Sequence, residues 1–309
     1  MMLCMRTAAA QPVSPPAAGG VAGVLPRTLL TALAPASWGT SYIVVTEMLP
    51  PGHPVFAAVL RALPAGLIAL AFTRVLPSGV WWLKAAVLGI LNIGVLNALI
   101  FVAAERLPGG VAGTLAAAQP LVVAVLAVLV LREPPSGWRL AWGAAGMAGV
   151  GLVVLGPAAA FDVVGVLAGL GAASSMALGI TLTKRWGRPP EASPTAFAGW
   201  QLIAGGLFLL PITALTEGAP PAVDGTAALG YLWLGLVGGL MAYVLWFRGI
   251  AALPVTSVAV LVLLSPLVAA TLGAVILGQT LGAVQLAGFA LALAAIVAGQ
   301  LPAPARTRR

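Results

Sequence analysis

The chain has 309 residues, of which 61% are hydrophobic and only 7% are charged, and its formal net charge is +8. Soluble domains usually carry about 25% charged residues, and so few charges could not cover the surface of a soluble fold of this length. The composition therefore excludes a water-soluble enzyme and a disordered chain, and it predicts an all-α polytopic membrane protein.

Apolar spans, each long enough to cross a hydrocarbon core of about 30 Å, follow one another at regular spacing along the chain. The preceding residues, 1–27, are rich in Ala, Pro and Gly and are predicted to form a mobile cytoplasmic tail. Residues 301–309 are predicted to form a basic cytoplasmic tail. The ten predicted spans are 28–47, 55–73, 85–104, 111–131, 139–157, 163–183, 194–215, 228–247, 255–277 and 282–300.

The charges between these spans predict the orientation in the membrane. With ten spans and the N-terminus inside, the 15 Lys and Arg residues fall in cytoplasmic segments, except Arg106 in an outer loop and Arg61 within a span. Most acidic residues, including Glu47 and Asp224, fall in the outer loops. Because cytoplasmic loops of membrane proteins carry an excess of Lys and Arg, both termini are predicted to be cytoplasmic.

An internal repeat relates the two halves of the chain. Residues 88–133 align without a gap with residues 234–279, and the alignment matches Pro120 to Pro266. Each half holds five spans, an odd number, so the second half enters the membrane from the opposite side. Such an inverted-topology repeat is the architecture of many secondary transporters, whose substrate sites lie near the membrane midplane between the halves.

Three further features carry a family resemblance. They are the motif Trp38-Gly39-Thr40-Ser41 in the first span, Arg61 in the second span, and two prolines that are each followed by Glu or Gln at the same spacing, Pro120 with Glu133 and Pro266 with Gln279. In this order, and with the repeat, they resemble the EamA branch of the drug/metabolite transporter superfamily. Residues 40–51 are also similar to the PecM-like pigment exporters within that branch. Gln279 departs from the motif, which often has Glu at this position.

The resemblance implies two EamA domains of five helices each, over residues 28–157 and 163–300. It also implies a secondary transporter that exports small metabolites, such as amino acids, related compounds, flat aromatic metabolites or drugs, across the bacterial inner membrane. An integral-membrane enzyme is disfavoured, because the chain holds one His, one Cys and few acids. A non-transporting membrane sensor or assembly subunit remains the alternative.

Polar and aromatic residues near the middle of the spans are the candidate substrate contacts, because polar groups at membrane depth are costly unless they are paired or face a cavity. Asn97 and Tyr243 are equivalent in the repeat, and Trp246 shares a helix face with Tyr243. Trp38 and Tyr42 are predicted to form a similar aromatic face in the first span. Interhelical hydrogen bonds or lipid contacts are the alternative roles for these side chains.

Arg61 is the one cation within a predicted span, and it needs a partner there. It is a candidate to bind a carboxylate of the substrate. The favoured alternative is that it extends to the outer surface or pairs with Glu47 or another outer acid. Its equivalent in the second half, Gln201, carries no charge.

Pro120 and Pro266 are predicted to lie in the middle of helices, with Gln119, a further candidate substrate contact, just before the first of them. Each proline should release the carbonyl four residues earlier, at Ala116 and Val262. The resulting kinks are candidates for gating, and static kinks are the alternative.

The residues missing from the spans indicate how transport is driven and which partners are expected. No acidic residue lies in mid-span, which favours facilitated diffusion or exchange over a buried carboxylate proton relay. No ATP-binding phosphate loop is found. The expected partners are a small-molecule substrate and the lipid bilayer, with no nucleic acid, no cofactor and no metal; a homodimer stays open.

Overall fold

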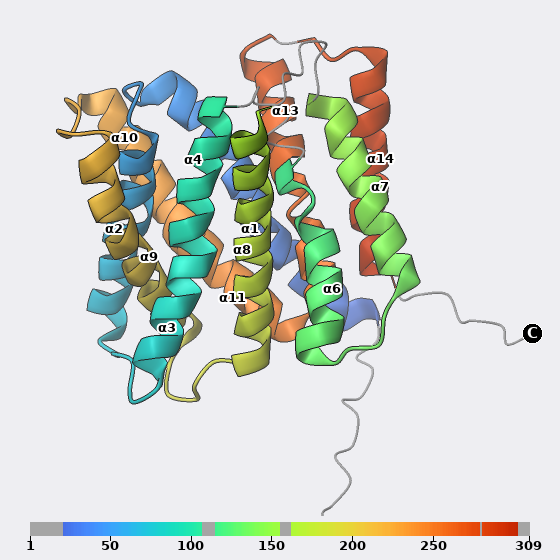
Figure 1. Cartoon of the computed structure of the whole chain (residues 1–309), viewed down its shortest axis with the longest axis horizontal. Coiled ribbons are helices and arrows are strands. Elements are labelled where there is room, and N and C mark those ends of the chain that lie inside the picture. Colours follow the sequence, from blue (N-terminus) through green and yellow to red (C-terminus); the bar gives the residue numbers. More distant parts are fainter. Residues whose placement is uncertain (1–20, 107–114, 155–161, 279, 302–309) are drawn as a thin grey trace, which may run out of the picture.

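The computed structural model describes residues 21–106, 115–154, 162–278 and 280–301, and within these ranges every regular element is a helix (Figure 1). Eight of the described helical segments are long and apolar enough to cross a membrane. The expected tail residues 1–20 and 302–309 lie outside the described ranges. The eight segments are Leu25–Met48, Pro54–Thr73, Trp81–Ile100, Val163–Trp186, Pro194–Thr216, Gly225–Ala252, Val255–Ile276 and Ala283–Gln300.

The helices of the first half follow the predicted spans. The first one begins at Val21, earlier than the predicted boundary at residue 28, and the span expected at 111–131 is described from residue 115 onward. The elements are α1 (Val21–Met48), α2 (Pro54–Thr73), α3 (Trp81–Gly89), η1 (Ile90–Val95), α4 (Leu96–Arg106), α6 (Gln119–Leu131) and α7 (Gly137–Val154).

The helices of the second half begin where the sequence supplies capping side chains. The side chains of Asp162, Ser193 and Asp224 each accept a hydrogen bond from a backbone N–H in the first turn, which stabilises helix starts. The elements are α8 (Val163–Trp186), α9 (Pro194–Thr216), α10 (Gly225–Trp233), η2 (Leu234–Met241), α11 (Ala242–Ala252), α12 (Val255–Leu261), α13 (Leu264–Ile276) and α14 (Ala283–Gln300).

Two π-helical segments, η1 and η2, interrupt the long helices 81–106 and 225–252. The repeat alignment places residues 90–95 of η1 opposite residues 236–241, which lie within η2. A π turn takes in one more residue than an α turn, and π segments occur frequently at functional sites. Hydrophobic periodicity did not predict either segment.

Both prolines expected in mid-helix lie instead in the first turn of a helix, which corrects that prediction. Pro120 is the second residue of α6, and Pro266 is the third residue of α13. Short turns at residues 117–118 and 262–263 precede them. The proline ring cannot pack against the carbonyl four residues earlier, so the helix breaks before each proline rather than kinking at it.

The two halves of the chain pack against each other through reciprocal contacts. Helix α2 packs on α9, and α7 packs on α14. Helix α9 also contacts η1, while α2 contacts η2; likewise α4 packs on α8, and α1 on α11. The picture shows the resulting bundle, with α7 and α14 side by side at one edge (Figure 1).

Glycine allows a close approach between α7 and α14. A Cβ atom on Gly288 would lie 2.6 Å from the carbonyl oxygen of Gly149, and a Cβ on Gly149 would lie 2.8 Å from the carbonyl oxygen of Gly288. Both distances are too short for a side chain, so the two backbones are in direct contact, as is common where membrane helices pack through small residues.

Candidate functional site

Four predicted site residues from three helices come together in the core. We call Trp38 of α1, Arg61 of α2, and Tyr243 and Trp246 of α11 the Arg61 cluster. The ring centroid of Trp38 lies 5.3 Å from that of Tyr243 and 5.2 Å from that of Trp246. Trp246 and Tyr243 are buried. Tilted and edge-on ring pairs at these separations are attractive, so the rings pack against one another.

Arg61 is held by a backbone carbonyl and by aromatic faces. Its Nε donates to the carbonyl oxygen of Gly238 at 3.2 Å, and the indole Nε1 of Trp38 donates to the same oxygen at 3.0 Å. The Cζ atom of Arg61 is 6.0 Å from the ring centroids of both Trp38 and Tyr243, within the range of cation–π attraction. Glu47 is exposed and makes no ion pair with Arg61.

The position of Gly238 in η2 explains how its backbone reaches these side chains. A Cβ atom on Gly238 would lie 3.5 Å from Ser41 Oγ and 3.7 Å from Arg61 Nε. Trp38 and Ser41, which are three residues apart on α1, therefore share the face that meets η2. Tyr42 is turned away from this contact and is 60% exposed. The predicted aromatic face of Trp38 and Tyr42 thus does not form at the cluster.

A second buried polar contact lies next to the Arg61 cluster. Asn92 of η1 donates through Nδ2 to Oε1 of Gln201 in α9, at 2.9 Å. The hydroxyl of Tyr243 donates to the carbonyl oxygen of Asn92 at 3.4 Å, which links this pair to the cluster. Asn92 is 1% exposed and Gln201 is fully buried. The repeat matches Gln201 to Arg61, but Asn92 is not among the predicted substrate contacts, because its role depends on the π-helical segment.

The remaining predicted contacts lie elsewhere. The amide Nδ2 of Asn97 donates to the carbonyl of Ile93 in its own helix at 2.6 Å, which is a local bond rather than a contact across the halves. Gln119 is buried at the start of α6. Asn97 and Tyr243 are equivalent in the repeat, but only Tyr243 belongs to the Arg61 cluster.

Several buried polar atoms have no hydrogen-bond partner among the described residues. They include Ser41 Oγ, Asn92 Oδ1, Gln119 Nε2 and Trp246 Nε1. Buried polar groups are nearly always paired, and each exception calls for an explanation. Ser41 Oγ and Trp246 Nε1 lie in or beside the Arg61 cluster, where a bound solute would find them, whereas Asn92 Oδ1 packs against Gly179 of α8.

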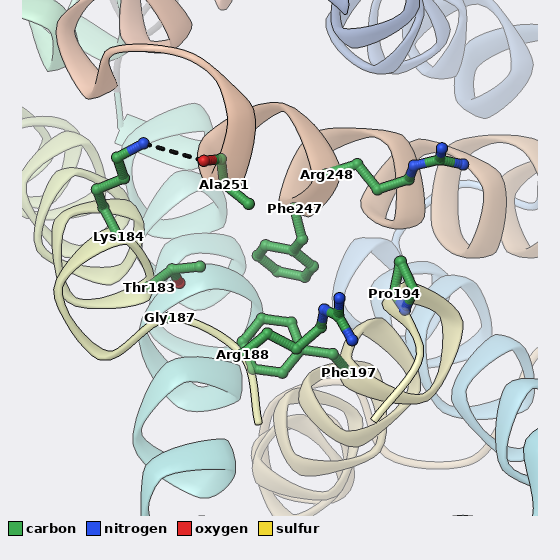
Figure 2. Close-up of a pocket in the computed structure, with 9 residues that line it drawn as sticks. All are labelled: Thr183, Lys184, Gly187, Arg188, Pro194, Phe197, Phe247, Arg248 and Ala251. Atoms are coloured by element: carbon green, nitrogen blue, oxygen red, sulfur yellow. Dashed lines mark hydrogen bonds between the residues drawn. The ribbon is translucent and has the colours of Figure 1, made fainter. Parts of the chain in front are cut away.

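A cavity of about 440 Å³ opens near the ends of α8, α9 and α11. Figure 2 shows its lining residues, which are Thr183, Lys184, Gly187, Arg188, Pro194, Phe197, Phe247, Arg248 and Ala251. The sequence did not predict this cavity, because the basic residues near these helix ends indicated only the orientation of the chain. The signal that could have drawn attention to it was Phe247 next to Arg248.

An aromatic pair separates the cavity from the Arg61 cluster. The ring centroids of Phe197 and Phe247 are 5.5 Å apart, and the centroid of Phe247 is 5.8 Å from that of Tyr243. Both phenylalanines are buried while also lining the cavity. A chain of touching rings therefore runs from the cavity through Phe247 and Tyr243 to Trp38.

Three known proteins are similar in sequence to this chain over most of its length. The chain is 42% identical over 264 residues to Protein PecM of Dickeya dadantii (strain 3937), covering 85% of this chain and 89% of that protein. It is 28% identical over 272 residues to the uncharacterized inner membrane transporter YedA of Escherichia coli (strain K12), covering 84% and 86% of the two chains. It is also 28% identical over 270 residues to a probable amino-acid metabolite efflux pump of Salmonella typhimurium (strain LT2), covering 84% and 89%.

The fold also has a counterpart among solved structures. One crystal structure superimposes with a TM-score of 0.76 over 90% of this chain and 98% of that chain, at 20% sequence identity. The EamA-like transporter family matches residues 26–155 and 163–298. The eight apolar helical segments, the inner membrane transporter relative and the family match together show that the chain is a multi-pass membrane protein. The chain belongs to the EamA-like transporter family.

Proposed function

We propose that this protein is a secondary transporter that exports small organic metabolites across the bacterial inner membrane by alternating access. The substrates are flat or apolar solutes that carry a carboxylate, including amino acids and related compounds. The observation that carries the proposal is the Arg61 cluster, which joins one cation to three aromatic rings where helices of the two halves meet. The names of two relatives, a transporter and an amino-acid metabolite efflux pump, are consistent with it.

The proposed architecture is ten membrane helices in two inverted halves of five, with both termini cytoplasmic. Two observations support it. The π-helical segments η1 and η2 occur at aligned positions, and the helix contacts are reciprocal between the halves. An inverted repeat places a solute site near the midplane, and the halves then rock around it.

The aromatic rings explain how such a site alternates. In the described structure the rings of Trp38, Tyr243 and Trp246 contact one another, so a solute enters only when these rings separate. The solute then replaces ring–ring contacts with ring–solute contacts, and its carboxylate pairs with the guanidinium of Arg61. A charge-assisted bond of this kind is stronger than a neutral one, which favours carboxylates over neutral analogues.

Transport is proposed to follow the substrate gradient. The groups that contact Arg61 are a carbonyl oxygen and two rings. None of these groups exchanges a proton at physiological pH, so the cluster itself offers no relay. Facilitated diffusion or exchange fits this set of groups better than proton antiport.

The test is solute flux in proteoliposomes that contain the purified chain. Neutral amino acids and flat aromatic carboxylates are loaded, with and without an imposed pH gradient. Tyr243→Ala is compared with Tyr42→Ala, which removes an exposed tyrosine ring outside the cluster. We expect carboxylate flux that is independent of the gradient, falls at least about tenfold in Tyr243→Ala, and persists in Tyr42→Ala.

Other results would contradict the proposal in distinct ways. Flux that follows the pH gradient would overturn the facilitated mechanism. Equal losses in both tyrosine variants would argue against the Arg61 cluster as the site. Absence of flux for every solute, with the protein folded, would favour a non-transporting sensor or assembly subunit.

A further inference from the structure

The cavity lined by Phe197 and Phe247 contains two arginines whose side chains make no stabilising contact among the described residues. Among the described residues, Arg188 and Arg248 make no ion pair and their side chains have no hydrogen-bond partner. Both are exposed and line the cavity. No acidic residue is among the lining residues, so their charge remains uncompensated there.

The third cation of the cavity has a structural role and provides a contrast. Lys184 Nζ donates to the carbonyl oxygens of Ile250, Ala251 and Leu253 at 2.9, 3.2 and 2.8 Å. It therefore caps the C-terminal end of α11, where a cation is favoured by the helix dipole. Figure 2 shows Lys184 directed to Ala251, on the other side of the Phe247 ring from Arg188 and Arg248.

The floor of the cavity is aromatic. Phe197 and Phe247 are buried, line the cavity together with the two arginines, and contact each other edge to face. A small inorganic anion would use the arginines alone, whereas an anion with an aromatic body would also cover these rings. Ligand pockets typically combine such an apolar lining with a few orienting polar groups.

Resting on the proposed export function, we propose that this cavity is a cytoplasmic loading site for anionic aromatic solutes. Arg188 and Arg248 bind the carboxylate or other anionic group, and Phe197 and Phe247 bind the ring. The Phe197–Phe247 pair then separates to admit the solute to the Arg61 cluster. Arg188 lies in the segment after α8 and Arg248 lies in the last two turns of α11, both on the face that the charge distribution predicts to be cytoplasmic.

The spacing of the groups supports a continuous route. Phe247 contacts Phe197 at the cavity and Tyr243 at the cluster, with centroid separations of 5.5 and 5.8 Å. The next cation on this route is Arg61, 6.0 Å from the Tyr243 ring centroid. An anionic ring compound thus passes along aromatic surfaces from Arg188 and Arg248 to Arg61. A cationic analogue is repelled by the first two arginines.

Binding of three ring-matched probes tests the loading site directly. The purified chain in phosphatidylcholine nanodiscs is titrated with radiolabelled indole-3-acetate, tryptophol and tryptamine, which share one ring system and differ in charge. The variant is Arg188→Gln/Arg248→Gln. The matched control is Arg27→Gln/Arg74→Gln, which removes two exposed cations from the same predicted face outside the cavity lining.

We expect indole-3-acetate to bind the native chain and to bind the Arg188→Gln/Arg248→Gln variant about tenfold more weakly. Tryptophol should bind both forms weakly and equally, tryptamine should not bind, and the control should behave as the native chain. Equal indole-3-acetate binding by the native chain and the cavity variant would overturn the proposal. An equal loss in the control would also overturn it, because the effect would then be general surface charge.

A lipid headgroup offers the same anionic chemistry, and a second arm distinguishes it. The titration is repeated in nanodiscs that contain phosphatidylglycerol. If the lipid abolishes indole-3-acetate binding, and the native chain enriches phosphatidylglycerol more than the cavity variant does, the cavity is a lipid site and the loading proposal fails. Retained binding in these nanodiscs supports the loading site.

The binding test does not require transport, so the two proposals fail separately. Binding that depends on Arg188 and Arg248, in a chain with no flux, would keep the anion site and reject the export function. Flux of indole-3-acetate with a KM that the Arg188→Gln/Arg248→Gln variant leaves unchanged would keep the export function and reject the loading site.

Discussion

Arg61 and Gln201 occupy matching positions in α2 and α9, and each is hydrogen bonded to the π-helical segment of the opposite half of the chain. Arg61 donates to the carbonyl of Gly238 in η2, and Gln201 accepts from the side chain of Asn92 in η1. Gly238 and Asn92 are themselves aligned in the repeat. The two contacts thus occupy equivalent positions in the two halves, but only the Arg61 contact includes a cation.

This asymmetry predicts the effect of Arg61→Gln. Glutamine can still donate to Gly238, so the variant should fold with little loss of stability while the positive charge is lost. Export of a carboxylate should fall at least about tenfold in kcat/KM, since a charge-assisted bond is removed, whereas a neutral analogue should be transported nearly as before. Competition flux with the two solutes measures the difference. An equal effect on both would assign Arg61 a structural role.

Trp246 is predicted to contact the solute through Nε1, which is buried and has no partner among the described residues. Trp246→Phe keeps an aromatic ring and removes this donor. We expect KM for a substrate to rise about five- to tenfold, which corresponds to one lost hydrogen bond of about 1–1.4 kcal/mol. Flux at varied substrate concentration measures this change.

Trp138→Phe is the matched control for that experiment. Trp138 Nε1 donates to the carbonyl of Ala298 at 2.9 Å, far from the cluster in sequence. Loss of this hydrogen bond should lower the free energy of unfolding by about 1 kcal/mol, and with it the thermal unfolding midpoint in detergent. KM should be unchanged. The reverse pattern in the two tryptophan variants would be inconsistent with the proposed role of Trp246.

Glu217 is predicted to stabilise the start of α2 from the other half of the chain. Its two carboxylate oxygens accept hydrogen bonds from the backbone N–H groups of Val55 and Phe56, at 2.6 and 2.8 Å. Glu217→Gln keeps one acceptor and removes the negative charge, so it should cost about 1 kcal/mol of stability. Thermal unfolding in detergent measures this loss.

Glu191→Gln is the control for the charge change. Glu191 is exposed and contacts Ser78 Oγ only at 3.4 Å, so its replacement should shift the unfolding midpoint little. Similar shifts for Glu217→Gln and Glu191→Gln would show that the cap contributes nothing.

The contact between α7 and α14 predicts a packing defect in Gly288→Ala. The added Cβ atom would lie 2.6 Å from the carbonyl oxygen of Gly149, so the two helices must move apart. Overpacking of this kind costs about 1–3 kcal/mol. Gly137→Ala is the control, because a Cβ atom there meets nothing within 4 Å. Unfolding curves that do not distinguish the two variants would contradict this close packing.

The proposed orientation is tested with single cysteines. In a Cys4→Ser background, Glu191→Cys lies in a predicted cytoplasmic loop and Ala222→Cys in a predicted outer loop, and both positions are exposed. In intact cells a membrane-impermeant maleimide should label Ala222→Cys and should label Glu191→Cys only after the membrane is opened. Labelling of Glu191→Cys in intact cells would contradict the predicted topology.

The sequence by itself determined the membrane class, the helical character of the described residues and the family. Long apolar runs specify helices because backbone groups in lipid must be paired within each segment. The repeat and the motifs around Trp38 and Arg61 led to the family, and the mid-span position of Arg61 made it a candidate substrate contact. These signals are local or depend on spacing along the chain, so they can be read without tertiary contacts.

The tertiary structure alone decided which of the candidate side chains meet. Tyr42 and Asn97 are polar or aromatic residues of the spans, like the cluster residues, but they lie outside the Arg61 cluster. The contacts of Asn92, Gly238 and the Phe197–Phe247 pair were not predicted. The physical reason is that uniformly apolar helices give no amphipathic pattern to define their facing sides. The π-helical turns also change the direction in which the following side chains point, so a regular period of 3.6 residues does not predict which of them face the neighbouring helices.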